Sequence, residues 1–323
     1  MLATPATPTS VFITGASSAL GRDLARRLVE AGHAVTGAVD GYRSALALRQ
    51  VGAVAAFPGV LRAGELRSAI QGAGAKVIVH LEPMKLNHVP HMNAHWADKL
   101  ADVQTGAEAV VRAAADAGVE YLVSTSYAFV YGNTGHAAAD EQTEIHNPEL
   151  SIIHTALAAE AAVLNGSVPA CILRAGYVYG AHDTATTELR DRLVAGRPVL
   201  VGNLRGVANW VYVDDLANAI LSALTLRPQG AILNVVDNTP VSPATFVNYL
   251  GDAMALPVSA RGSGGGLMAL FKAPPSEPEL IDLQTRASNA QAAEVLGWKP
   301  RFSSYREGLD QTLLVMRAEE PVV

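Results

Sequence analysis

The sequence predicts an α/β protein in which a doubly wound parallel sheet carries a small C-terminal lobe. Strand and helix patterns alternate through the first half, the connections between them are short, and the pattern changes after Arg174. Strand–helix alternation gives a parallel sheet with helices on both faces. Right-handed crossovers then place a ligand crevice at the carboxyl ends of the strands.

Short apolar runs define the expected strands, and apolar residues at helical spacing define the expected helices. We expect strands at Ser10–Thr14, Ala34–Val39, Ala53–Phe57, Val77–Leu81, Tyr121–Ser126 and Ala170–Arg174. We expect helices at Ala19–Ala31, Arg43–Val51, Glu65–Gln71, Asn93–Ala117 and Ser151–Leu164. After Arg174 we expect strands at Val207–Val213 and Ile232–Val236, and helices at Asp215–Leu226, Pro243–Ala253 and Ser288–Leu296.

The composition narrows the class of protein. The 323 residues carry a net charge of -6, which argues against a nucleic-acid partner, since nucleic acid attracts basic surfaces. No apolar run reaches the ~18 residues of a membrane span, and the N-terminus lacks the pattern of a signal peptide. We therefore expect a cytoplasmic protein with no membrane partner. The single Cys171 excludes an internal disulfide, and its apolar surroundings predict a buried strand thiol.

The segment from Val11 to Arg22 has the pattern of a strand, a glycine turn and a helix N-terminus. This arrangement presents backbone N–H groups and the positive end of a helix to a pyrophosphate. Ser18 stands where the middle glycine of such a loop would be. We expect a dinucleotide to contact Gly15, Ser17, Ser18, Leu20 and Gly21. The expected organisation is a disordered N-terminus (1–9), a dinucleotide-binding domain (10–174) and a mainly substrate-binding lobe (175–323) partly interleaved with the core.

Five further motifs follow in order along the chain. They are VIVHL at 77–81, STSYAFVYG at 124–132, LRAGYVYG at 173–180, NWVYVDDLA at 209–217, and LGWKP with REGL between 296 and 309. Together with the glycine loop they resemble the extended short-chain dehydrogenase/reductases, the NAD-dependent epimerases and dehydratases. The resemblance covers residues 10–314. It implies a Rossmann-like fold, NAD or NADP as cofactor, a small-molecule substrate, and a homodimer paired through helices 93–117 and 151–164.

The sequence departs from this family at the catalytic positions. The family transfers protons with a Tyr and a Lys four residues apart on one helix, and these positions align with Ile152 and Ala156. Neither side chain can carry a proton. Ala208 stands where the family holds a nucleotide-sugar phosphate with an Arg. The resemblance therefore argues against a nucleotide sugar and for a small, rather apolar substrate.

The cofactor preference depends on the end of the second expected strand. Asp40 can bond a ribose diol there, although Val39 aligns better with the family's acid. A turn residue is the alternative interpretation of Asp40. A carboxylate at this place slightly favours NAD over NADP, because it repels a 2′-phosphate, but the nearby Arg43 weakens the preference. Val60 replaces an Asp that faces adenine in the family.

Four residues are candidates for a rebuilt active site. Ser126 aligns with the family's catalytic Ser, and Tyr127 follows it. Tyr177 occupies a position whose family counterpart faces substrate. Glu82 is a strand-end acid whose pKa an apolar cleft would raise, which suits proton abstraction. Each has a structural alternative: local backbone bonding for Ser126, packing for the two tyrosines, and a salt bridge or solvated acid for Glu82.

A histidine cluster raises the question of a metal. His88, His91 and His95 recur at helical spacing, and three His side chains can hold zinc. However, Pro90 interrupts the start of any helix, and side chains at this spacing rarely converge on one ion. We therefore predict no metal site, and leave open a polar lid at the substrate cleft or a solvated surface.

Three functions fit these observations. The first is an enzyme that uses NAD or NADP, with proton transfer rebuilt around Ser126, Tyr127 or Glu82. The second is a cofactor-independent isomerase, cyclase or lyase on the same scaffold. The third is a non-catalytic sensor of a dinucleotide or small ligand. The sequence favours an enzyme, because the catalytic positions have changed to apolar residues while the scaffold is kept.

Overall fold

The computed structural model describes residues 8–81, 83–84, 96–197, 199–201, 206–258, 260–261 and 283–319. A parallel seven-stranded sheet has the order β10-β6-β5-β4-β1-β2-β3, which confirms the predicted fold class. Its strands are β1 (Ser10–Thr14), β2 (Ala34–Ala38), β3 (Val54–Ala56), β4 (Val77–His80), β5 (Tyr121–Tyr127), β6 (Ala170–Ala175) and β10 (Ile232–Val235). The chain runs outward from β1 to β3 and then restarts at β4 on the other side of β1. The point where the strand order reverses therefore lies between β1 and β4.

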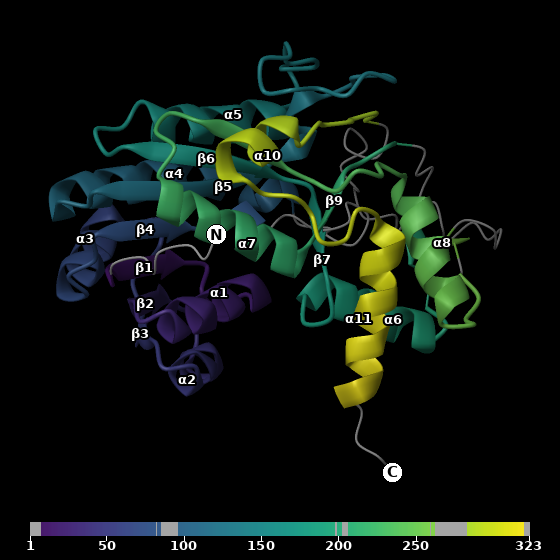
Figure 1. Ribbon diagram of the computed structural model, residues 1–323, viewed down its shortest axis with the longest axis horizontal. Helices are drawn as coiled ribbons and strands as arrows, with labels where there is room; N and C mark the ends of the chain where they lie inside the picture. Colours follow the sequence, from purple (N-terminus) through teal and green to yellow (C-terminus); the bar gives the residue numbers. More distant parts are fainter. Residues whose placement is uncertain are drawn as a thin grey trace.

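Helices cover both faces of this sheet (Figure 1). One face carries α3 (Ala63–Gly72), α4 (Trp96–Ala117) and α5 (Ser151–Leu164). The other carries α1 (Ala19–Glu30), α2 (Tyr42–Gln50), α7 (Val213–Leu226) and α10 (Ala290–Leu296). The expected strand over Val207–Val213 is shorter in the structure, because α7 already begins at Val213. Two acids in its first turn, Asp214 and Asp215, favour this start.

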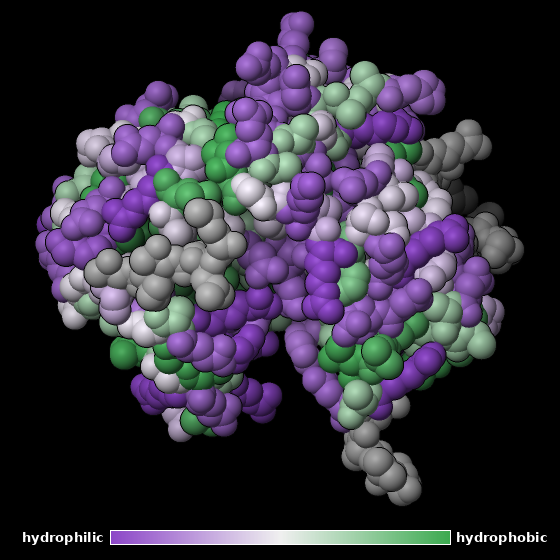
Figure 2. Space-filling view, viewed as in Figure 1, coloured by the Kyte–Doolittle hydropathy of each residue, from purple (hydrophilic) through white to green (hydrophobic). Residues whose placement is uncertain are grey.

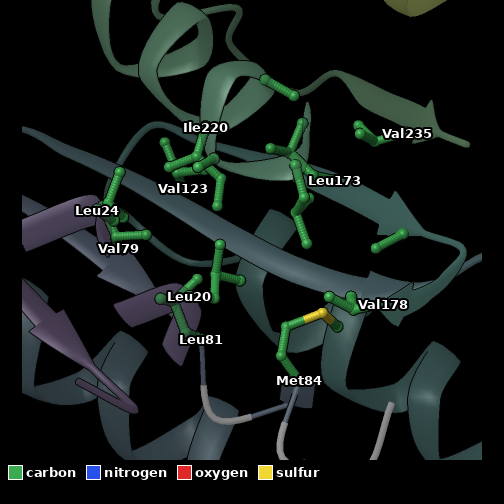
Figure 3. Packing of buried hydrophobic residues seen from close by; sticks show 14 of the residues in the cluster. Leu20, Leu24, Val79, Leu81, Met84, Val123, Leu173, Val178, Ile220 and Val235 are labelled. Atoms are coloured by element: carbon green, nitrogen blue, oxygen red, sulfur yellow. The ribbon is translucent and has the colours of Figure 1, made fainter. Parts of the chain in front are cut away.

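The two faces of the sheet differ in chemistry. Under α1 and α7 the side chains are apolar; Leu24, Val79, Val123, Leu173 and Ile220 belong to one buried cluster (Figure 3). The opposite face carries polar register partners on neighbouring strands: Thr14 pairs with His80, His80 with Ser124, Ser126 with Arg174, and Arg174 with Asn234. All of these polar residues are buried, so this face must satisfy them internally.

The chain beyond β6 forms a second part beside the sheet. It contains the paired strands β7 (Tyr177–Tyr179) and β9 (Trp210–Tyr212), the pair β8 (Leu200–Val201) and β11 (Ala260–Arg261), and helices α6 (Thr184–Val194), α8 (Pro243–Ala253) and α11 (Tyr305–Glu319). β10 returns to the main sheet beside β6. Figure 2 shows the surface hollowed between the part with α1 and α2 and the part with α6 and α11.

Candidate active site

The glycine loop joins β1 to α1 in a closed turn. Gly15 has a φ of 69°, in the left-handed region that favours glycine. The Ser18 hydroxyl accepts the Gly21 N–H at 3.0 Å and donates to the Gly15 carbonyl at 2.8 Å. A Cβ on Gly21 would lie 2.6 Å from that carbonyl, so the close packing of helix on turn requires glycine. The N–H groups in the first turn of a helix have no partners inside the helix. In α1 these are the N–H groups of Ala19 and Leu20, which are therefore available to a phosphate.

The carboxyl end of β2 meets this loop through Asp40. The Ser17 hydroxyl donates to Asp40 Oδ1 at 2.6 Å, and the Ser44 hydroxyl lies 3.4 Å from the same oxygen. Asp40 and Arg43 are both exposed. Open N–H groups for phosphates and an exposed carboxylate for a ribose diol match the chemistry of a dinucleotide. The structure thus brings the seven residues predicted for the cofactor to one edge of the sheet.

The α5 helix carries Ile152 and Ala156, the two positions that the sequence aligns with the catalytic Tyr and Lys of the family it resembles. Ile152 and Ala156 lie on its buried face. Ala156 lines a small cavity of about 10 Å³ between β5, α4 and α5, together with Ser124, Ser126 and Glu160. The side chains that reach this cavity come from the sheet and from Glu160, one turn further along α5.

Ser126 takes part in a buried network of charges. Its hydroxyl donates to Glu160 Oε1 at 2.5 Å. The Arg174 guanidinium donates to both oxygens of Glu160, at 2.9 and 2.6 Å, and lies 4.8 Å from the centre of the Tyr131 ring. The Tyr131 hydroxyl in turn donates to Asn234 Oδ1 at 2.9 Å. The Ser126 hydroxyl is therefore engaged in holding the polar face of the sheet together.

Tyr127 is also engaged. Its hydroxyl donates to the Pro83 carbonyl at 2.7 Å, and its ring stacks on Phe129 at a centroid distance of 4.8 Å. Phe129 belongs to a short 3-10 helix, η3 (Ala128–Tyr131). Complete burial raises the pKa of the Tyr127 phenol. The side chain connects β5 to the turn that follows β4.

Tyr177 lines a pocket at the carboxyl edge of the sheet. The pocket has a cavity volume of about 20 Å³ and is lined by residues of η3, β6, β7, the start of α8 and three loops; they are Ala128, Phe129, Ala175, Gly176, Tyr177, Gly206, Val207, Ala208, Asn209, Pro243, Leu283 and Thr285. The Tyr177 ring contacts Phe129 and Trp210. Its hydroxyl has no hydrogen-bond partner in the part of the chain that the structure describes, and burial raises its pKa. Among the predicted catalytic residues that the structure describes, Tyr177 both lines this pocket and has a hydroxyl without a described protein partner.

The other polar groups of this pocket are engaged with the backbone. Asn209 Oδ1 accepts the Ala287 N–H at 2.8 Å, and the Thr285 hydroxyl donates to the Gly132 carbonyl at 2.7 Å. No charged side chain lines the pocket among the described residues. The pocket therefore offers a ligand mainly apolar contacts and the Tyr177 hydroxyl.

The sequence motifs do not point to His80, Glu160 or Arg174, three polar residues that the structure buries. His80 is fully buried with Nδ1 2.8 Å from Thr14 Oγ1, while its Nε2 has no partner among the described residues. Burial lowers its pKa to about 4, so it is neutral at pH 7. In the sequence, Arg174 stands at the end of an apolar run. A charge in such a place is buried with the strand and needs a buried partner, so this pattern predicts an ion pair.

Several remaining predictions have different outcomes. Cys171 is a buried free thiol, as predicted. Glu82, His88, His91 and His95 lie outside the described residues. Within the described ranges, no group of three His, Cys, Asp or Glu residues could hold a metal ion. The same ranges contain no helix that is long and apolar enough to span a membrane.

Comparisons with known proteins agree with this architecture. The 3-diazoavenalumate denitrifying reductase of a Streptomyces species is 28% identical over 316 residues, which cover 93% of this chain and 98% of that protein. A 4-hydroxy-2-methyl-3-oxo-4-farnesyl-3,4-dihydroquinoline-1-oxide ketoreductase of Stigmatella aurantiaca is 28% identical, over 74% of this chain and 71% of that protein. The fold is similar to that of DesIV, a dTDP-glucose 4,6-dehydratase from Streptomyces venezuelae with NAD bound; the TM-score is 0.77 at 19% identity, covering 96% and 97% of the two chains. The model of the NAD-dependent epimerase/dehydratase family matches residues 11–235, and this protein therefore belongs to that family.

Proposed function

We propose that this protein is an NAD(P)-dependent reductase of a small, uncharged and rather apolar substrate that carries a carbonyl group. The observation that carries the proposal is the Tyr177 hydroxyl. It belongs to a pocket whose other polar side chains are engaged, whereas the hydroxyls of Ser126 and Tyr127 donate to protein groups. A free phenol beside an apolar pocket is suited to meet the oxygen of a bound substrate.

The edge formed by the glycine loop and Asp40 would hold the cofactor. The N–H groups of Ala19 and Leu20 would bind its phosphates, and the Asp40 carboxylate would accept a ribose hydroxyl. NAD is slightly preferred, because a carboxylate here repels a 2′-phosphate. When bound, the reduced cofactor supplies a hydride to the substrate.

Tyr177 would supply the proton. Burial raises the pKa of its phenol, which keeps the group protonated at neutral pH and able to donate a hydrogen bond to the carbonyl oxygen. As this oxygen gains negative charge, it becomes more basic than a tyrosinate, so the proton passes from Tyr177 to the new hydroxyl group.

The pocket supports an uncharged substrate. Ala208 lines it where the family's resemblance implies a phosphate-binding Arg, and no cation replaces it among the described lining residues. A phosphate in this pocket would lose its hydration without gaining a partner. The names of the two relatives, a denitrifying reductase and a ketoreductase, contain no nucleotide sugar, and the second includes an apolar farnesyl group.

Calorimetric titration of the cofactor-stripped protein with NADH and NADPH, and then with NAD⁺ and NADP⁺, tests the first half of the proposal. We expect micromolar binding of at least one pair. Loss of NADH or NADPH absorbance with a panel of apolar ketones and aldehydes then tests the second half, with nucleotide sugars as negative controls. No heat with any of the four nucleotides up to millimolar concentration would overturn the proposal.

A cofactor-independent isomerase, cyclase or lyase is the second candidate. The observation that favours it is that Ile152 and Ala156, both buried, occupy the family's proton-transfer positions. An intact pocket that binds ligand without any nucleotide would support this function. Nucleotide binding without turnover, accompanied by a change in a partner interaction, would instead support a sensor.

We also propose that the protein is a cytoplasmic homodimer paired through α4 and α5. The two helices lie side by side, and the half-buried Ala158 and the exposed Ala161 leave room for close helix packing. Ala107, Ala156 and Ala159 already pack within the chain and are not available for such a contact. Sedimentation at micromolar concentration tests the dimer, and a single monomer mass would exclude it.

A further inference from the structure

A dinucleotide that binds the N-terminus of α1 and reaches Tyr177 must cross the carboxyl ends of β1 and β4, where the strand order reverses. The chain leaves β4 through Leu81 and turns at Pro83 and Met84. The Met84 N–H donates to the Leu81 carbonyl at 2.9 Å, which closes this turn. The turn therefore lies on the path between the two ends of the crevice.

The Met84 side chain, which this turn carries, is only 7% exposed. It shares a buried cluster with Leu20, Leu81 and Val178. Figure 3 shows its thioether pointing toward Val178, with Leu20 and Leu81 at its other end. Leu20 belongs to the first turn of α1, and Val178 directly follows Tyr177. Met84 is thus buried between the first turn of α1 and the β7 strand that carries Tyr177.

Tyr127 holds the turn that carries Met84. Its hydroxyl donates to the Pro83 carbonyl at 2.7 Å, and its ring is fixed by stacking on Phe129, which itself lines the substrate pocket. A buried phenol that bonds a backbone carbonyl restricts the conformation of that carbonyl and of the next residue. This contact gives the Tyr127 hydroxyl a role other than proton transfer.

We propose that Met84 occupies the place of the nicotinamide ring of the cofactor, and that this ring displaces the Met84 side chain when it binds. Tyr127 is then a positioning residue for Met84. The inference rests on the dinucleotide binding proposed above. Methionine suits such a place, because it is unbranched, has three rotatable side-chain bonds and repacks easily in an irregular apolar space.

The test compares two probes, NADH and ADP-ribose, which share the adenosine diphosphate and ribose part and differ in the nicotinamide. In the Met84→Ala variant we expect NADH to bind about tenfold more tightly than in the wild type, because a buried side chain no longer has to leave. The affinity for ADP-ribose should stay unchanged. Met84→Leu keeps the bulk and should keep the wild-type ratio of the two affinities.

Met316→Ala is the matched control, since it removes a similarly buried methionine from α11, outside the crevice. It should leave the ratio unchanged. Tyr127→Phe frees the Pro83 carbonyl and should shift the ratio toward NADH by a smaller factor than Met84→Ala. A merely structural role of Tyr127 would weaken or preserve both affinities together.

A second measurement uses the wild-type protein and does not depend on how the variant folds. The chain has six methionines, so ¹³C-labelled methionine methyl groups give few resonances, and Met84→Leu assigns one of them. NADH should shift the Met84 resonance and ADP-ribose should not. Equal effects of both probes, on this resonance and on the affinities, would overturn the inference while leaving the proposed function intact. Failure of both probes to bind either protein would overturn both.

Discussion

The two ends of the crevice differ in how they depend on side chains. At the nucleotide end, binding rests on backbone N–H groups and on a turn that needs only Gly15 and Gly21 to form, so Ser18 is accommodated by bonding its own loop. At the reaction end, proton transfer needs particular titratable groups, and the positions that the sequence aligns with the family's catalytic pair hold Ile152 and Ala156, which cannot carry a proton. If the proposed function is correct, the comparison teaches that the nucleotide end of such a site can keep its backbone form while the reaction end is rebuilt from a different element.

The largest expected effect tests the rebuilt end. Tyr177→Phe removes the one described pocket hydroxyl without a protein partner, and should lower kcat about 10²- to 10⁴-fold, the range for loss of a general acid. NADH affinity should not change, because the nucleotide end is untouched. Steady-state kinetics and calorimetry on the same preparation measure the two quantities separately.

Ser126→Ala is the matched control for this experiment, since it also removes one buried hydroxyl. Its hydroxyl donates to Glu160, so we expect only a small change in kcat. If Ser126→Ala abolishes turnover and Tyr177→Phe does not, the reaction end has kept the family's Ser, and the comparison fails at that point.

The next effect concerns the stability of the network beneath the reaction end. Glu160→Ala leaves the Arg174 guanidinium buried without its counter-charge, and should lower the free energy of unfolding by about 3–5 kcal/mol. Urea denaturation measures this loss. Ser126→Ala should cost only about 1 kcal/mol, since it removes one hydrogen bond. A Glu160→Ala protein of wild-type stability would show that the pair does not support the sheet.

The sequence predicts the central fold well because its signals are local. β1, α5 and α8 match the expected ranges, since each is a mainly apolar segment with polar or turn residues near its ends. The strand β7 has only three residues, too few for a period. By contrast, α11 carries Leu309, Leu313 and Met316 at helical spacing, so the sequence does contain a signal for this helix.

The candidate site divides in the same way. The residues predicted for the cofactor in the glycine loop follow from a local motif, and hydrogen bonds between Ser17 and Asp40 join this loop to the end of β2. The engagement of Ser126 and Tyr127 could not be predicted, because their partners lie 34 and 44 residues away. Such pairings depend on how strands and helices pack, which residue spacing alone does not determine.

A pH experiment tests the boundary between the two ends, where His80 lies at the end of β4. Its pKa is about 4 in the folded state and about 6.5 when unfolded, so the unfolded chain binds the additional proton between these values. Burying the neutral His80 ring costs no proton above about pH 6.5, so the folded state keeps its full stability there. As the pH falls from 6.5 toward 4, the unfolded chain is protonated first and the folded state loses stability. We expect a loss of about 3 kcal/mol across this window in urea denaturation.

His80→Gln is uncharged throughout this range and should remove that part of the pH dependence. Thr14→Val is the control, because it removes the hydroxyl that faces His80 Nδ1 without removing the titrating group. A pH dependence that persists unchanged in His80→Gln would assign the effect to other groups.

The smallest effect tests the nucleotide end. Asp40→Asn keeps the shape of the side chain and removes its charge, so NADH should bind about tenfold more weakly while NADPH binding changes little or improves. Ser44→Ala is the control, because it removes only the 3.4 Å contact to Asp40 and should leave both affinities unchanged. Calorimetry with the two cofactors gives the ratio directly. Equal affinities of wild type and Asp40→Asn for NADH would assign Asp40 to the turn alone, and the nucleotide end of the crevice would then consist of the backbone of the glycine loop.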